Sequence, residues 1–203
     1  MTRSQTLTIL SGIALMAVTT FPAAPVFADD AALYDAPAPE DAVFVRVLEE
    51  FDAPASDAAF MGAPLQLGED QRDVYVAISA GALEGAVAGS YYSLADAGQV
   101  IEEPQRETAA KVHLILVNAG DAPVRLIVPG RGMEVVAAQA PGASASRAVN
   151  PVSATLAVER VTDNAILGTF DVNLARGQNV TFVAGDDAAR LVPNSFGPVL
   201  SLN

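Results

Sequence analysis

The chain has no cysteine and no tryptophan, and His113 is the single histidine among its 203 residues. A chain without cysteine forms neither disulfide bonds nor thiolate metal sites, so its core alone must stabilise the fold. One histidine without cysteine also excludes most zinc arrangements. With no tryptophan and only four tyrosines, the chain has little material for the aromatic platform of a sugar-binding groove.

Basic residues are scarce as well, because 11 Lys and Arg stand against 24 Asp and Glu, for a net charge of -13. Nucleic acids and anionic lipid surfaces attract clusters of basic residues. The composition therefore argues against both as partners. Because the protein and a polyanionic polysaccharide are both negatively charged, the composition also argues against tight direct binding between them.

Long apolar runs are absent except near the N-terminus. Arg3 precedes the apolar residues 7–20 ("LTILSGIALMAVTT"), and Pro22 and Pro25 follow before a small-residue site that ends at Ala28. This pattern predicts a signal peptide cleaved after Ala28. The mature chain of 175 residues would lose the charge of Arg3 and carry about -14. The alternative is an uncleaved N-terminal anchor.

After this segment, short runs rich in Val, Ile, Leu and Thr recur between Gly, Pro, Asn and Asp. In "VFVRVLEE", the side chains of Phe44, Arg46 and Leu48 alternate with those of Val45 and Val47. The runs cover residues 43–50, 73–79, 90–95, 111–118, 124–130, 133–139, 153–161, 165–175 and 179–185. Many short strands at such spacing predict an all-β protein built from antiparallel sandwiches.

The chain is expected to form two small antiparallel β-sandwich domains in tandem. Residues 43–47 and 111–115 begin two blocks of strands with similar sequences. Between the blocks, a polar stretch with Pro104 is typical of a linker. We therefore predict an N-terminal domain over residues 29–102, a linker over 103–110 and a C-terminal domain over 111–203. One continuous sandwich is the alternative.

The stretch "VIEEPQRETAAKVHLILVN" contains the residues that most suggest catalysis, Glu102, Glu103 and His113. Adjacent carboxylates in an extended chain point to opposite sides, so they do not converge on one bond as glycosidase pairs do. We expect both glutamates to be solvated. His113 lies in a strand pattern without a nucleophile motif or an orienting partner, which favours a structural or surface-facing histidine.

No other motif in the sequence indicates catalysis, a cofactor or a metal ion. A spaced Asp/Asn/Gly loop for calcium is absent. The stretch "GRGMEV" from Gly130 lacks the lysine and the spacing of a phosphate-binding loop. We therefore predict no catalytic, cofactor-binding or metal-binding residues, although an unrecognised carboxylate or serine site stays open as an alternative.

Four stretches, taken in order, resemble one known family. They are "AALYDAPAPEDAVFVRV", "YYSLADAGQVIEEPQ", "KVHLILVNAGDAPVRLIV" and "SRAVNPVSATLAV". Their order after a signal peptide is similar to that of the AlgF family, periplasmic accessory proteins of alginate O-acetylation. The matching residues are Ala32, Leu33, Tyr34, Phe44, Val45, Arg46, Val47, Ile101, Glu102, Glu103, Pro104, Asn150, Pro151 and Val152.

The resemblance implies a periplasmic tandem β-sandwich protein that does not itself transfer acetyl groups. It implies two partners, a periplasmic SGNH-type O-acetyltransferase and a membrane-bound O-acyltransferase of the same polysaccharide system. The strong acidity of this chain departs from the family, so a related acetylated exopolysaccharide is also open. A generic exported β-sandwich binding module, unrelated to acetylation, is the alternative function.

Three residues are candidates for contact with a protein partner. Tyr34 is an aromatic residue in an extended arm, Arg46 is a charge within a strand pattern, and Arg147 is the basic residue three positions before Asn150. Each has a local alternative. Tyr34 could pack on its own domain, Arg46 could be solvated or form a salt bridge, and Arg147 could serve a turn.

Overall fold

A computed structural model of the protein describes residues 37–106 and 108–202. The predicted signal peptide and Tyr34 lie outside these residues. Strands β1 to β15 and short 3-10 helices form the regular structure, which confirms the predicted all-β class. The 3-10 helices are η2 (Ala55–Asp57), η3 (Glu69–Gln71), η4 (Ala80–Ala82) and η5 (Asp96–Gly98). No described helix is long and apolar enough to cross a membrane.

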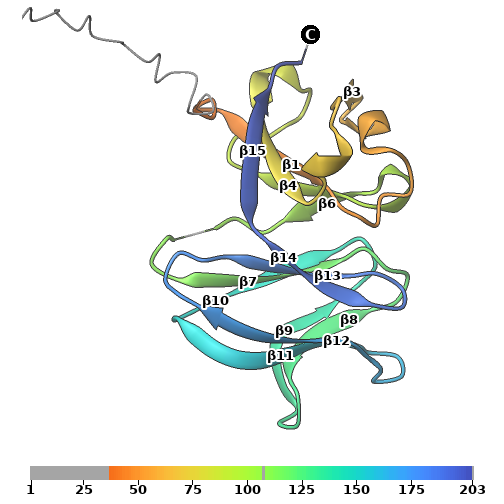
Figure 1. Ribbon diagram of the computed structural model, residues 1–203, viewed down its shortest axis with the longest axis vertical. Helices are drawn as coiled ribbons and strands as arrows, with labels where there is room; N and C mark the ends of the chain where they lie inside the picture. Colours follow the sequence, from red (N-terminus) through yellow and green to blue (C-terminus); the bar gives the residue numbers. More distant parts are fainter. Residues whose placement is uncertain (1–36, 107, 203) are drawn as a thin grey trace, which may run out of the picture. The chain divides into compact units, whose positions relative to one another are not determined.

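The first sheet has five strands in the order β15-β4-β1-β5-β6 (Figure 1). Their bounds are β1 (Ala42–Val47), β4 (Val74–Ser79), β5 (Tyr91–Leu94), β6 (Val100–Glu103) and β15 (Ser195–Leu200). The central strand β1 is antiparallel to β4 and parallel to β5. The edge strand β15, dark blue in Figure 1, runs parallel to β4. A separate hairpin pairs β2 (Ala59–Phe60) with β3 (Ala63–Pro64).

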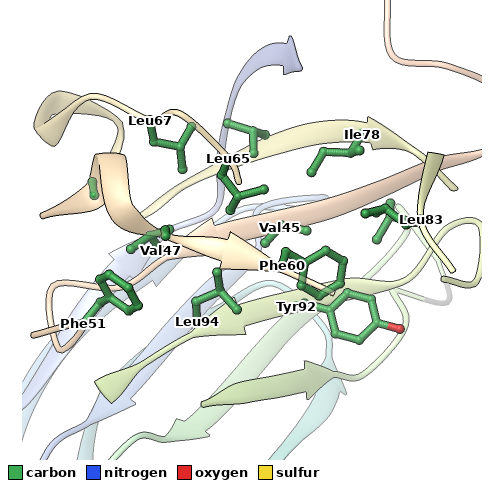
Figure 2. Close-up of a cluster of buried hydrophobic side chains, with 14 residues drawn as sticks. Val45, Val47, Phe51, Phe60, Leu65, Leu67, Ile78, Leu83, Tyr92 and Leu94 are labelled. Atoms are coloured by element: carbon green, nitrogen blue, oxygen red, sulfur yellow. The ribbon is translucent and has the colours of Figure 1, made fainter. Parts of the chain in front are cut away.

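One face of the first sheet packs against residues 51–67 and is apolar. Because successive side chains of a strand alternate, Val43, Val45 and Val47 of β1 all point to this face. Figure 2 shows the rings of Phe60 and Tyr92 next to each other in the cluster. Their centroids lie 4.9 Å apart. This cluster is the core that holds the loop segment onto the sheet.

Two four-stranded sheets form the second core. One has the order β10-β7-β13-β14 and the other β12-β11-β8-β9. Their bounds are β7 (Val112–Asn118), β8 (Val124–Val128), β9 (Met133–Gln139), β10 (Ser144–Val149), β11 (Val152–Arg160), β12 (Ile166–Leu174), β13 (Val180–Ala184) and β14 (Ala189–Pro193). Only β7 and β13 pair in parallel among these strands. Leu114 and Leu116 of β7, Leu156 of β11 and Phe182 of β13 share one buried cluster, as in a sandwich.

The strand β7 is buried on both faces, because a third cluster covers its other side. Ile115 and Val117 of β7 point away from the second core into this cluster. Its members are Leu48, Ala95, Ile101, Ile115, Val117, Val183 and Val192. Apolar residues of the first sheet and its loops therefore pack directly on the sheet of β7 and β13.

The division into domains at residues 29–102, 103–110 and 111–203 stays a prediction. The described residues between β6 and β7 form neither strand nor helix, as in a linker. However, β15 lies within residues 111–203 and pairs with β4 of the first sheet.

Candidate functional site

The second face of the first sheet is polar at its centre. Strand β1 turns Arg46 to this face, because its neighbours Val45 and Val47 point to the other one. In the sheet register, Arg46 lies beside Ser93 of β5, and Tyr91 of β5 lies beside Glu103 of β6. Three adjacent strands thus bring an arginine, a serine and a glutamate together.

Glu103 is the centre of a buried polar network, here called the Glu103 network. Its Oε1 accepts hydrogen bonds from Arg46 Nη2 at 2.9 Å and from Ser93 Oγ at 2.6 Å. Its Oε2 accepts from the Tyr75 hydroxyl at 2.7 Å and from Arg106 Nη2 at 2.8 Å. Arg46 Nε also donates to Ser93 Oγ at 2.8 Å. A buried carboxylate with four donors is well satisfied.

Opposing effects set the ionisation of this network. Burial alone would raise the pKa of Glu103, but the Arg46 and Arg106 guanidinium groups and the hydrogen bonds from Ser93 and Tyr75 hold that pKa below its ordinary value. Burial, and then the Glu103 carboxylate, raise the pKa of Tyr75 well above its ordinary value. At neutral pH the network therefore contains a charged glutamate, two charged arginines and a neutral phenol.

Aromatic rings extend the Glu103 network to the surface. The guanidinium carbon of Arg106 lies 3.8 Å from the centroid of the Tyr91 ring, a cation–π contact. The Tyr91 ring stacks on Phe44 at 4.8 Å. Phe196 of β15 lies 5.5 Å from both Phe44 and Tyr75, and 58% of its surface is exposed. The aromatic cluster therefore has one large apolar side chain in solvent.

A cleft of about 540 Å³, here called the polar cleft, opens beside these rings. Tyr91, Arg106 and Phe196 contribute to its lining. The other polar lining groups are the side-chain amides of Asn173, Gln178, Asn179 and Asn194. Asn194 Oδ1 accepts a hydrogen bond from Thr181 Oγ1 at 2.9 Å, which fixes the orientation of that amide.

His113 is buried in β7 and contacts one amide of the polar cleft. Its Nδ1 lies 3.0 Å from Asn179 Oδ1, which also accepts the backbone N–H of His113 at 3.0 Å. Its Nε2 is buried and has no hydrogen-bond partner in the part of the chain that the structure describes. Because the ring contacts an amide and no hydroxyl nucleophile, the geometry supports a structural histidine.

The polar cleft has the chemistry of a binding surface. Its guanidinium and amide groups can donate hydrogen bonds, its amide oxygens can accept them, and its rings can stack. Nucleophilic catalysis would require a base beside a nucleophile, and His113 has no such neighbour among the described hydrogen bonds. Within residues 37–106 and 108–202, no group of three or more His, Asp or Glu side chains could hold a metal ion.

The prediction for Glu102 and Glu103 is confirmed in one respect and wrong in another. The two carboxylates diverge as expected, because Glu102 is exposed and Glu103 is buried at the end of β6. The expectation that both would be solvated is wrong for Glu103. Its burial is stable because Arg46 and Arg106, 57 and three positions away in sequence, supply the compensating charges.

The structure places two of the three candidate contact residues, and their settings differ. Arg46 has no exposed surface and pairs with Glu103, which favours its alternative role in a salt bridge. Arg147 is exposed on β10, and its Nη1 lies 3.4 and 3.3 Å from the carbonyl oxygens of Glu134 and Val135. Tyr34 lies outside the described residues. Contact of any of the three with a partner stays a prediction.

Comparison with known proteins gives one informative relative. A protein of Pseudomonas putida, named alginate biosynthesis protein AlgF, is 27% identical to this chain over 201 residues. The alignment covers 92% of this chain and 91% of the relative. No family model matches the chain. The similarity runs through nearly the whole of both sequences and supports the relationship to the AlgF family that the four motifs indicated.

Proposed function

We propose that the protein is a non-catalytic periplasmic accessory protein for the O-acetylation of alginate or of a related exopolysaccharide. The observation that carries the proposal is the similarity to the Pseudomonas putida protein over 92% of the chain. That relative is named for alginate biosynthesis, and the order of the four sequence motifs points to the accessory proteins of acetylation.

The protein would act by binding enzymes. Its partners would be a periplasmic SGNH-type O-acetyltransferase and a membrane-bound O-acyltransferase of the same polysaccharide system. The polar cleft supports this role, because aromatic and arginine side chains dominate the energetics of many protein interfaces. Phe196, Tyr91 and Arg106 combine these residue types around one cleft.

The polymer itself is not the proposed ligand. Alginate is a polyuronate, and the net charge of -13 repels it at distances up to the screening length. The purified protein should therefore show no tight, salt-resistant binding to oligouronates. Such binding in isothermal titration calorimetry would contradict this part of the proposal.

A deletion strain tests the biological role. Loss of the gene should leave the amount of polymer unchanged and remove its acetyl groups, as measured by NMR of the purified polysaccharide. Expression of the full chain should restore acetylation. Normal acetylation in the deletion strain would overturn the proposal and favour a generic exported binding module.

A binding experiment tests the mechanism. Purified protein should bind the purified exported acetyltransferase of its own organism, and the Phe196→Ser variant tests whether the polar cleft takes part. The control is Val87→Ser, which changes an apolar side chain that is 60% exposed and does not line the polar cleft. Weaker binding of Phe196→Ser alone supports contact through the polar cleft, and equal binding of both variants places the contact elsewhere.

A further inference from the structure

A second cleft lies at one end of the two four-stranded sheets and differs in chemistry from the polar cleft. This apolar cleft has a volume of about 500 Å³. Residues 128–135, from β8, β9 and the turn between them, and residues 147–156, from β10, β11 and their connection, provide most of its walls. Aliphatic side chains such as Val135, Val149 and Val152 line it, and Met133 at its edge is 52% exposed. Its lining contains no aromatic ring and no carboxylate.

Two arginines of this acidic protein face the apolar cleft without a carboxylate partner. Six of the nine arginines within residues 37–106 and 108–202 form an ion pair with Asp or Glu. The other three are Arg131, Arg147 and Arg176. Arg131 and Arg147 both line the apolar cleft, so its lining carries two positive side chains and no negative one, although the protein carries -13 overall.

Local structure places both guanidinium groups at the cleft. Arg131 lies between Gly130 and Gly132, whose φ angles of 73° and 60° allow the tight turn from β8 to β9. Arg147 is held by long hydrogen bonds to two carbonyl oxygens of β9. Carbonyl oxygens carry no net charge, so Arg147 keeps an unneutralised positive charge at the cleft.

We propose that the apolar cleft binds a peptide segment of a partner protein that combines apolar side chains with at least one carboxylate. The aliphatic walls would bury the apolar side chains, and Arg131 and Arg147 would pair with the carboxylate. Arginine suits this task because its planar fork donates two parallel hydrogen bonds to one carboxylate. The inference rests on the proposed adaptor function and specifies the chemistry of one contact.

The lining favours a peptide over a uronate sugar. A sugar site usually offers an aromatic ring for stacking and several neutral hydrogen-bonding groups. The apolar cleft offers aliphatic surface with two cations, and its neutral polar side chains are Ser153 and Thr155 alone. This combination matches the side chains of a segment with apolar residues beside Asp or Glu.

The first experiment measures binding of the full mature protein to the purified exported acetyltransferase by isothermal titration calorimetry. The double variant Arg131→Glu/Arg147→Glu should weaken binding at least about tenfold, because it replaces two attractive contacts by repulsive ones. The matched control is Arg176→Glu, which reverses an exposed arginine outside the apolar cleft. Met133→Ser should weaken binding by a smaller factor without a change in charge.

The outcomes separate this inference from the proposed function. If the wild type binds and the double variant binds equally well, the apolar cleft is not the contact and the adaptor function survives. If Arg176→Glu weakens binding as much as the double variant, general charge explains the effect and the inference fails. Circular dichroism and thermal unfolding of each variant exclude misfolding as the cause.

A second experiment decides the case in which the acetyltransferase does not bind at all. A synthetic peptide of alternating Val and Asp is titrated into labelled protein, and backbone amide signals are followed by NMR. Shifts confined to residues 128–135 and 147–156, absent with a Val/Lys peptide, would support the cleft although the proposed partner had failed. Equal shifts with both peptides, shifts elsewhere, no shifts, or displacement of the Val/Asp peptide by oligouronate would overturn the inference.

Discussion

Arginine side chains have opposite environments in two parts of the molecule. In the first sheet, Arg46 is fully buried and its charge is matched by Glu103. At the end of the second core, Arg147 is exposed beside the apolar cleft, and among the described residues it donates hydrogen bonds to carbonyl oxygens alone. In so acidic a protein a carboxylate is easily placed beside an arginine. The arginines without one are therefore the informative residues for binding, and the paired ones for stability.

The largest expected effect tests the buried half of this comparison. Glu103→Gln leaves two arginines near a neutral amide and should cost about 3–5 kcal/mol of unfolding free energy, the usual cost of a broken buried ion pair. Urea denaturation at pH 7 measures it. Glu102→Gln, one residue away and exposed, should change stability by less than about 0.5 kcal/mol. Equal effects of the two substitutions would show that Glu103 has no special role.

A smaller loss of unfolding free energy is expected on removal of Arg190, where the first sheet meets β14. Arg190 Nη2 donates to Glu50 at 2.6 Å and to Asp73 at 2.9 Å, and the three side chains are 20–25% exposed. Arg190→Ala should therefore cost about 1–2 kcal/mol, more than a surface pair and less than a buried one. Arg176→Ala is the control in the same denaturation assay. No difference between the variants would mean that solvent screens this cluster completely.

The smallest effect concerns pH. The pKa of Glu103 is lower in the folded protein than its ordinary value of 4.5, so its contribution is complete above that pH and is lost as pH falls through the folded pKa. The stability gap between wild type and Glu103→Gln should narrow below about pH 4.5. The gap between wild type and Leu116→Ala, an apolar change in the second core, should stay constant. Parallel behaviour of the two gaps would contradict the charged state of Glu103.

The sequence predicted most strands but missed those without clear periodicity. Residues 133–139 were predicted as a strand and form β9 with the same bounds. Strand β15 was missed, because "SFGPVL" contains glycine and proline and shows no alternation. Tertiary pairing with β4 stabilises it instead. Residues 189–193, which form β14, were missed for a similar reason, since Arg190 and Pro193 interrupt the apolar pattern.

The candidate site was harder to predict than the fold. Arg46 stood out as a charge within a strand pattern, and such a charge implies a buried partner if both faces are covered. The sequence offered many carboxylates as that partner, and nothing local selected Glu103. Arg106 lay in the predicted linker and Phe196 in a segment without periodicity. No sequence pattern therefore marked either residue as part of the polar cleft. Arg147 was a candidate because it is the basic residue three positions before Asn150, and its contact with a partner stays a prediction.

The pairing of β15 with β4 joins two strands that are synthesised far apart in time. Strands β1 and β4 are synthesised well before residues 195–200, so β4 stays an unpaired edge until β15 forms. An open strand edge attracts other chains. Residues 195–200 therefore cover the edge of β4, and removing them would leave the backbone N–H and C=O groups of β4 open to pairing with another chain.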